Sequence, residues 1–386
     1  MPAIDISRPD FMSEPELEQF ADSVSGFFGR EAPPEVVQAW RDQGRVDLEM
    51  WRKSGEQGLL GVSIPLEYGG GGGDFRHDVI MSEQLVKHGL DGFALQLHNV
   101  IILPYIYAHG TEDQKRQWLP RLCSGELISA IAMSEPGAGS DLQSIRTTAT
   151  KDGKGYRING SKTFISNGQI ANFIVVVAKT DASLGAKGLS LFLLQTDGAE
   201  GFRRGKSLDK IGLDAQDTSE LYFDDVFVPA ENLLGLIEGQ GFAQLMAELP
   251  RERLLMAVSG VSTMERAIDA TVEYTKQRKA FGQTIFEFQN TQFKLAEAKA
   301  KATVARSFVN DCVARALKGE LDNTTSAIAK LWVTETEWQI VDDCLQLHGG
   351  YGYVNDYPIA QIFRNSRVQR IYGGSSEIMK VLIARS

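Results

Sequence analysis

The sharpest candidate for a functional site is a loop near the middle of the chain, AMSEPGAGSDL at residues 132–142. Gly137 and Gly139 allow its backbone to turn tightly, so that Ser134, Ser140 and backbone N–H groups could point at one place. Such a loop suits an anionic or carbonyl-rich ligand. The alternative is an ordinary surface turn, which composition alone favours. The ligand-binding interpretation therefore depends on the neighbouring motifs.

A second candidate is GSKTFISNG at residues 160–168. Phe164 and Ser166 alternate with Ile165 on an expected strand, which places an aromatic ring and a hydroxyl on the same side. The ring could stack on a flat ring system. The alternative is a cross-strand packing pair, which is the commoner use of such an aromatic residue.

The region before these motifs, residues 1–129, is expected to form a helical N-terminal domain. An apolar stripe at helical spacing opens it, formed by Leu17, Phe20, Val24, Phe27 and Phe28. Thr111 is the expected N-cap of a later helix. The run of five glycines from Gly69 to Gly73 predicts a loop between helices.

Residues 130–240, which contain both motifs, predict a central antiparallel β domain. The runs NFIVVVAKT, GLSLFLLQT and ELYFDDVFV are rich in β-forming residues and follow one another without intervening helices. This order disfavours a parallel doubly wound sheet, and a Rossmann dinucleotide site with it.

Residues 241–386 return to helical patterning and predict a C-terminal antiparallel bundle. Two apolar stripes are expected to form its core: Phe293, Ala296, Ala300, Val304, Phe308, Cys312 and Ala316, and then Ile328, Leu331, Trp338, Val341 and Leu345. The expected fold class is thus α+β multidomain, with helical, β and helical parts in that order.

Composition and charge narrow the class of protein. The 386 residues are 43% hydrophobic and 23% charged, as in a soluble globular protein of two or three domains. A formal net charge of −10 disfavours a nucleic-acid partner. No apolar run approaches the roughly 20 residues of a membrane span. The N-terminal sequence MPAIDISRPDFMSEPELEQF lacks the basic segment and apolar core of a secretory signal.

The cysteines and histidines bear on compartment and metal binding. Three widely spaced cysteines suit a reducing compartment, so a cytoplasmic location is predicted. The five histidines show no HxxxH or HExxH spacing, and no CxxC pair is present. No metal site is therefore predicted.

Three further blocks complete the set of motifs: ELPRERLLMA at residues 248–257, YTKQRKAFG at 274–282 and RIYGGSSEIMKVLIAR at 370–385. Together with the two earlier motifs they resemble the acyl-CoA dehydrogenase family, most closely its long-chain members, from residue 58 to the C-terminus. The resemblance implies a homotetramer of three-domain subunits with FAD between the β domain and the C-terminal helices. It also implies that an acyl-CoA becomes a trans-2-enoyl-CoA, with hydride passing from Cβ to flavin N5 and electrons then passing to an electron-transferring flavoprotein.

The resemblance further implies roles for single residues. Those expected to line the flavin and its ribityl chain are Met133, Ser134, Gly139, Phe164 and Ser166, while Ser140 would face the CoA phosphates. Residues expected to meet the FAD pyrophosphate and its surroundings from a neighbouring subunit are Arg278, Phe281 and Gln289. The remaining adenosine and pyrophosphate contacts would be Gln346, Gly349, Gly350, Ser375 and Glu377.

The base that removes the α-proton is expected at Glu252. Many members of the family carry a glutamate directly after an Ile-Tyr pair, where this chain has Gly373. The long-chain and isovaleryl branches also lack that glutamate, and they place it in a Glu-Arg-Leu triplet, which is residues 252–254 here. Arg253 matches a substrate-side arginine of the family, and an ordinary ion pair is its alternative role.

Two physical expectations accompany this assignment. Gly373 should leave its volume open, and its N–H could bond the thioester oxygen. Pro250 should end or kink the helix, which would put Glu252 in the first turn beyond the break. A glutamate there favours the helix dipole without any catalysis, and this is the alternative role for Glu252.

Two other functions stay open at this point. The same fold could serve a flavin-dependent acyl-CoA oxidase or monooxygenase, in which oxygen reaches the reduced flavin. It could also serve a non-catalytic CoA-ester binding protein. The sequence does not set the length or branching of the acyl chain.

Overall fold

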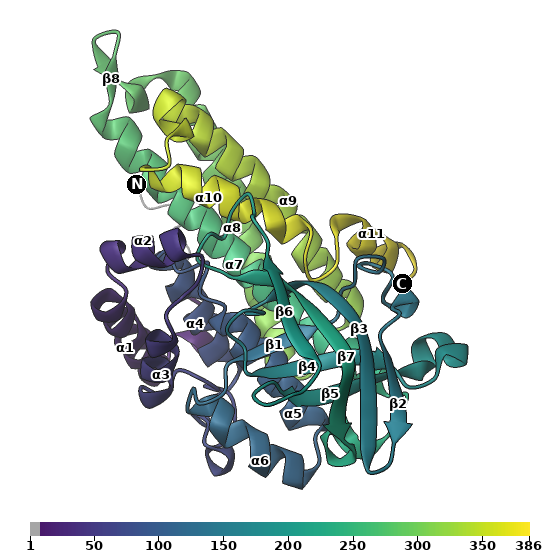
Figure 1. Cartoon of the computed structure of the whole chain (residues 1–386). Coiled ribbons are helices and arrows are strands. Elements are labelled where there is room, and N and C mark those ends of the chain that lie inside the picture. The colour runs from purple at the N-terminus through teal and green to yellow at the C-terminus, as the bar shows by residue number, and fades with distance from the viewer. Residues whose placement is uncertain (1–7) are drawn as a thin grey trace.

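Helices make up the first part of residues 8–386, which the computed structural model describes (Figure 1). They are α1 (Pro15–Glu31), α2 (Pro34–Gln43), α3 (Leu48–Glu56), α4 (Phe75–Lys87), α5 (Leu103–His109) and α6 (Glu112–Cys123). A π-helical segment, Leu97–Ile102, leads directly into α5. The prediction that the N-terminal segment lacks a secretory signal falls partly on residues 1–7, which lie outside the described residues.

Local sequence signals account for much of this region. In α1, Leu17, Val24, Phe27 and Phe28 are buried, as the predicted stripe requires. At the start of α6 the Thr111 hydroxyl accepts a hydrogen bond from the Gln114 N–H, and the Gln114 side chain accepts one from the Thr111 N–H. This reciprocal cap confirms the predicted helix start. The glycine run from residue 69 to 73 forms the loop before α4, as predicted.

A seven-stranded sheet forms the central part of the chain. Its strands are β1 (Ser129–Ala132), β2 (Thr148–Asp152), β3 (Gly155–Ser166), β4 (Phe173–Lys179), β5 (Leu189–Gln195), β6 (Phe202–Ser207) and β7 (Thr218–Pro229). They lie in the order β1-β4-β2-β3-β7-β6, and β5 pairs with β4.

The expectation of a purely antiparallel sheet is wrong in two places. β1 pairs with β4 in parallel along its whole length, and β2 meets β4 in parallel at a single residue pair. The reason is the path of the chain, because the β2–β3 hairpin intervenes between β1 and β4 and returns the chain in the original direction. The other ladders are antiparallel.

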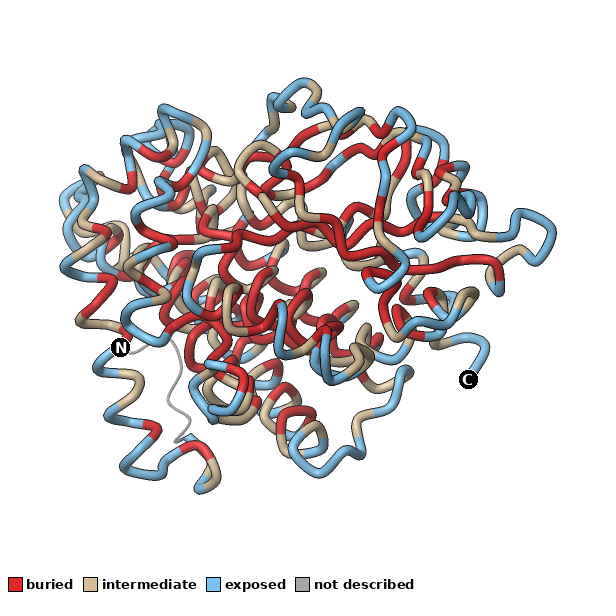
Figure 2. Tube along the Cα trace, turned by 60° about the horizontal axis from the view of Figure 1, so that its bottom comes forward, coloured by how far each residue is buried: buried red, intermediate tan, exposed pale blue. Residues whose placement is uncertain are grey.

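Both faces of β4 are buried, which explains its continuous apolar run. Phe173, Val175 and Val177 belong to a cluster that includes residues of α5 and α6. Ile174 and Val176 pack on the other side, against residues of β3 and β7. One face of the sheet therefore packs against the N-terminal helices, and the other face covers a second core. Figure 2 shows the buried segments gathered in the interior of the molecule.

The last part of the chain is a helical bundle. It comprises α7 (Gly241–Gln277), α8 (Gln289–Leu317), α9 (Asn323–His348), α10 (Pro358–Ser366) and α11 (Ser376–Ala384), with a short hairpin of β8 (Lys279–Ala280) and β9 (Gln283–Thr284) after α7. The hairpin projects at the end of the bundle that lies far from the sheet (Figure 1).

The predicted core stripe of α8 is largely on the wrong face. Phe293 and Val304 are each 58% exposed. The buried residues are instead Thr291, Leu295, Ala298, Ala302, Ala305, Val309, Cys312 and Val313, so that only Cys312 is shared. The alanines on this face let α8 approach its neighbours closely, whereas Phe293 and Val304 lie outside. In α9, Val341 is buried, but Ile328 is exposed and the rest of its stripe is partly buried.

Pro250 neither ends nor breaks α7, which runs without interruption from Gly241 to Gln277. A proline removes one N–H donor from the helix, and its cost can be offset by burial of the helix on several sides. Glu252 thus lies three turns into a long helix. The alternative role for Glu252, a first-turn glutamate that favours the helix dipole, does not apply.

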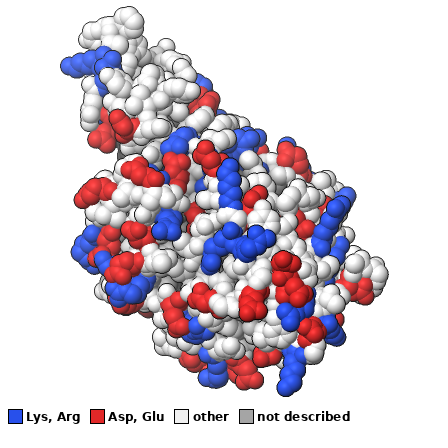
Figure 3. Space-filling model, viewed as in Figure 1, with Lys and Arg blue, Asp and Glu red and all other residues white. Residues whose placement is uncertain are grey.

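The helices and the surface charges bear on membrane contact and on partners. Among residues 8–386, no helix is both long and apolar enough to cross a membrane. On the face that Figure 3 shows, acidic and basic side chains are interspersed, and the projecting end of the bundle carries few charges.

Candidate active site

Glu252 is a buried carboxylate on α7, with 4% of its surface exposed. One of its oxygens accepts a hydrogen bond of 2.8 Å from the hydroxyl of Tyr105, on α5. Burial raises the pKa of Glu252 to about 7, and the charge of Glu248 adds to the rise, while the Tyr105 hydrogen bond and Arg253 oppose it. A carboxylate with this pKa can exist both charged and neutral near neutral pH, as a general base must.

Gly373 lies against the same face of α7, one turn beyond Glu252. A Cβ atom at Gly373 would overlap the end of the Met256 side chain, and Met256 follows Glu252 by four residues. The expectation that Gly373 leaves its volume open is therefore wrong, because Met256 occupies that volume. Gly373 also has φ of +60°, a left-handed conformation that glycine adopts most readily.

Two buried cations stand near this position. Arg253 donates to the side chain of Asn323 at 3.2 Å, and its Nε has no hydrogen-bond partner among residues 8–386. Lys330, on α9, donates to the carbonyl oxygen of Gly374. Burial, together with the charge of Arg253, lowers the pKa of Lys330 to about 8. Lys330 therefore fixes the turn that contains Gly373.

The loop after β1 is tied to strand β3. The ammonium of Lys162, which is fully buried, lies 2.9 Å from Glu135 and 3.0 Å from the carbonyl oxygen of Met133. The Thr163 N–H also donates to the Ser134 carbonyl oxygen at 2.9 Å. The predicted flavin-lining residues Met133 and Ser134 are thus brought directly beside the strand that carries Phe164.

Phe164 and Ser166 are both more exposed than Ile165 between them, as the expected alternation requires, but the strand is irregular at Phe164. Phe164 has φ of +59° and lies where the β3–β7 register shifts, so a β-bulge turns it outward. Its side chain is 69% exposed, whereas Ile165 is buried and Ser166 is partly buried. An aromatic ring held outward by a strained backbone fits the stacking of a flat ring system better than internal packing does.

The glycines of the loop are not required by the fold of the chain itself. A Cβ at Gly137 or Gly139 would meet no other atom, and neither residue has a left-handed φ. The expected tight turn is present between Glu135 and Ala138, which exchange backbone hydrogen bonds of 2.9 and 3.0 Å around Gly137, but neither glycine is needed for a left-handed φ. Their lack of side chains, next to exposed Ser140, instead leaves the backbone N–H groups accessible to a polyanionic ligand.

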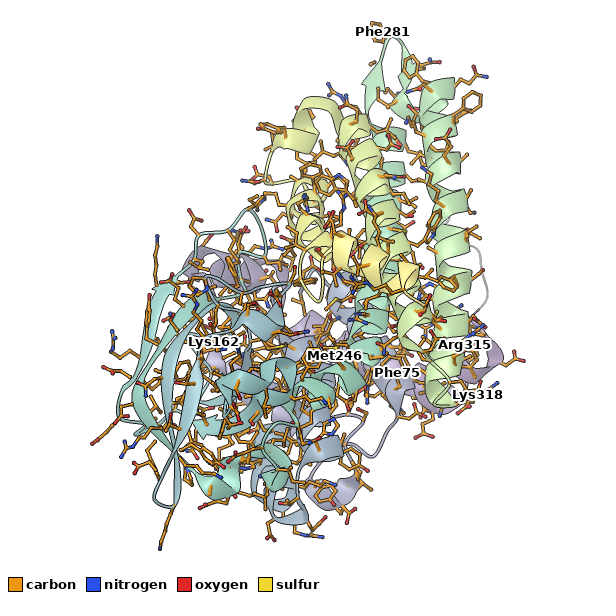
Figure 4. All side chains as sticks on the ribbon, turned by 90° about the vertical axis from the view of Figure 1, so that its right-hand side faces the viewer. Phe75, Lys162, Met246, Phe281, Arg315 and Lys318 are labelled. Carbon is orange, nitrogen blue, oxygen red and sulfur yellow. The ribbon has the colours of Figure 1, made fainter. Side chains whose placement is uncertain are left out.

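The residues expected to contact FAD from a neighbouring subunit lie at the other end of the bundle. Arg278 follows α7 and sits over the ring of Tyr351 at 5.5 Å. Phe281, at the tip of the hairpin, is 97% exposed, and Figure 4 shows it far from Lys162. Between Glu252 and Arg278, α7 rises about 39 Å. One chain therefore does not bring these residues to the sheet-side loop.

The other expected FAD contacts divide between the two ends. Gln346 lies in the last turn of α9, and Gly349 and Gly350 directly follow that helix. The Tyr274 hydroxyl donates to the His348 carbonyl oxygen there, so these residues lie with Arg278. Gln289 begins α8 at the same end. Ser375 caps α11, and Glu377 lies in its first turn, directly after the Gly373–Gly374 turn. This pair therefore lies at the Glu252 end.

The sequence interpretation missed three residues of the site. Tyr105 lies in an apolar run that gives no sign of its contact. Lys330 carried a signal, because it continues a buried stripe on α9 formed by Ala327, Lys330, Thr334, Glu337, Val341 and Cys344. A charged residue on such a stripe indicates a special environment. Met256 could be placed only once Gly373 was known to contact α7.

Three family models match consecutive parts of the chain: acyl-CoA dehydrogenase N-terminal domain at residues 14–126, middle domain at 130–226 and C-terminal domain at 239–386. The chain belongs to the acyl-CoA dehydrogenase family, whose members are FAD-dependent enzymes acting on a CH–CH group. The helical, β and helical architecture is the fold of this family.

Individual relatives agree with this assignment. The mitochondrial long-chain specific acyl-CoA dehydrogenase of Sus scrofa is 46% identical over 380 residues, which are 98% of this chain and 87% of the relative. Mitochondrial isovaleryl-CoA dehydrogenase of Solanum tuberosum is 36% identical over 95% of this chain and 89% of its own. The crystal structure of acyl-CoA dehydrogenase from Geobacillus kaustophilus superposes with a TM-score of 0.94 at 44% identity, covering 96% of this chain and 98% of that one.

Proposed function

We propose that this enzyme removes the α-proton and the β-hydrogen of an acyl-CoA thioester, giving the trans-2-enoyl-CoA, with Glu252 as the base. One observation carries the proposal: a buried carboxylate whose pKa is raised to about 7 lies on the face of α7 that Gly373 contacts. Family membership supplies the reaction class, since the family acts on acyl-CoA substrates with FAD.

The residues of the chain have distinct tasks in this reaction. The ionised Glu252 accepts the α-proton, and the Tyr105 hydroxyl holds one carboxylate oxygen so that the other is directed at the substrate. The Gly373 N–H donates to the thioester oxygen, where negative charge develops, and Lys330 holds that turn in place. FAD, when bound, supplies the acceptor for the hydride that leaves Cβ. Arg253 lies on the substrate side.

We assign the cofactor contacts to the two clusters described above. Met133, Ser134, Gly139, Phe164 and Ser166 would hold the flavin and its ribityl chain, and Ser140 the CoA phosphates. Arg278, Phe281, Gln289, Gln346, Gly349 and Gly350 would reach the FAD of a neighbouring subunit, and Ser375 and Glu377 would complete the contacts. The exposed apolar side chains near the hairpin and along α8 support a homotetramer.

Three further assignments belong to the same proposal. The domains are residues 1–129, 130–240 and 241–386. The three cysteines are buried and free, as a reducing compartment allows, and the cytoplasm is our proposed location. An electron-transferring flavoprotein is the proposed electron acceptor, and one solved structure related to this chain, 35% identical with a TM-score of 0.91, is described as the electron transferring flavoprotein of Acidaminococcus fermentans.

Anaerobic mixing of the FAD-loaded enzyme with acyl-CoAs of graded length and branching tests the reaction. We expect at least one acyl-CoA to bleach the flavin absorbance and the enoyl-CoA to form in equal amount. Slow reoxidation in air, but fast reoxidation by an electron-transferring flavoprotein, is expected of a dehydrogenase. Rapid air oxidation with peroxide release would instead identify an oxidase. A colourless protein that binds no added FAD would revive the CoA-ester binding protein.

Replacing Tyr105 with Phe should move the pH dependence of flavin reduction to higher pH. The Tyr105 hydrogen bond lowers the pKa of Glu252, so its loss raises that pKa, and a higher pH is needed to ionise the base. Stopped-flow reduction rates across pH measure the shift. Tyr107→Phe, on the same helix but 39% exposed, is the matched control and should leave the profile in place. A Tyr105→Phe profile that moves to lower pH, or does not move, contradicts the assignment.

A further inference from the structure

Glu337 is another buried carboxylate, and the reaction described above does not use it. It lies on α9 with 0% of its surface exposed, and neither carboxyl oxygen has a hydrogen-bond partner within residues 8–386. Burial raises the pKa of Glu337 well above its ordinary value, and the charge of Asp91 adds to the rise. A buried acid with no partner costs stability, so its presence calls for a function.

The chain makes room for this carboxyl group. Gly260 lies opposite it in the middle of α7, where glycine is a poor helix former. A Cβ atom at Gly260 would lie 3.0 Å from a Glu337 carboxyl oxygen and still closer to Val333. The close packing of α7 on α9 therefore depends on that glycine and fixes the side chain of Glu337.

Glu337 lines a small cavity of about 50 Å³, which is enough for a few water molecules. The polar side chains around it include Asp91, Gln96, Ser259, Thr263 and Tyr372. Several of these are already paired: Gln96 donates to Ser259 at 3.1 Å, and Asp91 accepts from Asn365 at 3.1 Å. The Glu337 carboxyl group is thus a polar group of the cavity that stays available for a ligand.

The cavity lies in line with the proposed reaction site. Ser259 and Thr263 follow Glu252 by seven and eleven residues, so all three share one face of α7. The rise along the helix from Glu252 to Ser259 is about 10 Å. Tyr372, on the cavity wall, directly precedes Gly373. An acyl chain whose α-carbon lies at Glu252 and which extends along α7 therefore points at Glu337.

We propose that this cavity receives the distal part of the acyl chain and that Glu337 selects chains carrying a hydroxyl group there. The inference rests on the proposed function, because it takes the thioester to lie at Glu252. A hydroxyl can donate to an ionised carboxylate, and it can donate to or accept from a protonated carboxyl group, so it pairs with Glu337 in either state. A carboxylate at the end of the chain would meet the acids Glu337 and Asp91 and is disfavoured. An alkyl end would displace water and leave Glu337 without a partner.

The test uses pairs of non-reactive CoA thioethers with graded chain lengths, each with and without a terminal hydroxyl. Calorimetry on the FAD-loaded enzyme measures their affinities without requiring turnover. At the length that reaches Glu337, we expect the hydroxylated chain to bind at least tenfold more tightly than the plain chain. Glu337→Gln should retain this preference, because an amide also donates and accepts hydrogen bonds. Glu337→Leu should reverse it.

The test has one control variant, and two results would contradict the proposals. Asp342→Asn removes a charge from the exposed side of α9 and should leave the preference unchanged. Equal affinity for both chain types at every length in the unmodified enzyme overturns the inference, even if a variant fails to fold. If no acyl-CoA bleaches the flavin but the hydroxyl preference holds, the proposed reaction is wrong and the binding site stands.

Discussion

We expect Glu252→Gln to retain bound FAD, and we expect acyl-CoA to reduce that FAD on the order of 10³ times more slowly than in the unmodified enzyme, or more slowly still. The substitution keeps the size of the side chain and its contact with Tyr105, and it removes the proton acceptor. General-base catalysis contributes about 10²–10⁴-fold, and the expected loss of about 10³-fold lies within that range. Anaerobic stopped-flow bleaching of the flavin measures the rate.

Glu248→Gln is the matched control for this variant. Glu248 lies one turn earlier on α7, bonds to His109 at 3.1 Å and raises the pKa of Glu252 through its charge. Its replacement should lower that pKa and shift the pH profile to lower pH, with the maximal rate nearly unchanged. If Glu252→Gln retains a near-normal rate while its FAD absorbance is intact, another group is the base.

The second large effect is expected when the base is moved from position 252 to position 373. Glu252→Gly should be inactive, and adding Gly373→Glu should recover flavin reduction at least tenfold over it, because both positions address one α-proton. Recovery should be partial. The new side chain must displace the flexible end of Met256, and a left-handed backbone costs a non-glycine residue about 1–2 kcal/mol. Adding Met256→Ala should raise the recovered rate further.

The control for this exchange has the same bulk without the charge. Glu252→Gly combined with Gly373→Gln fills the same space but offers no base, so it should stay inactive. Recovery by glutamine as well as glutamate would mean that the effect is one of packing. If glutamate at position 373 gives no recovery, even after Met256→Ala, then positions 252 and 373 do not address the same α-proton.

Much of the fold could be predicted because residue periodicity is a local property. The stripe of α1 and the cap at Thr111 depend on neighbours a few residues away. The parallel pairing of β1 with β4 depends on where a hairpin returns the chain, which no local pattern encodes. Pro250 misled us because intrinsic propensity is overruled when a helix is packed on several sides. On α8, the contact face mixes alanines with Leu295 and Val309, whereas Phe293 and Val304 point outward.

In the candidate site, too, local sequence features could be predicted and contacts between distant segments could not. Glu252 could be proposed as the base from its triplet and the glycine at 373, but its environment could not be predicted, since Tyr105 comes from a helix nearly 150 residues earlier in the chain. The outward turn of Phe164 arises from a register shift that strand alternation does not reveal. Lys330 and Glu337 were detectable as charges on an otherwise buried stripe, and a buried charge on such a stripe is a signal worth testing in other sequences.

The backbone at Gly373 also has an evolutionary consequence. From the present arrangement, a first mutation to glutamate at that position meets Met256 and an unfavourable φ, while Glu252 still serves. A first mutation at Glu252 removes the base. Either order passes through a less fit ancestor, so the location of the base should persist through a lineage even while chain-length preference drifts. The location of the base should then indicate common ancestry more reliably than the preferred substrate does.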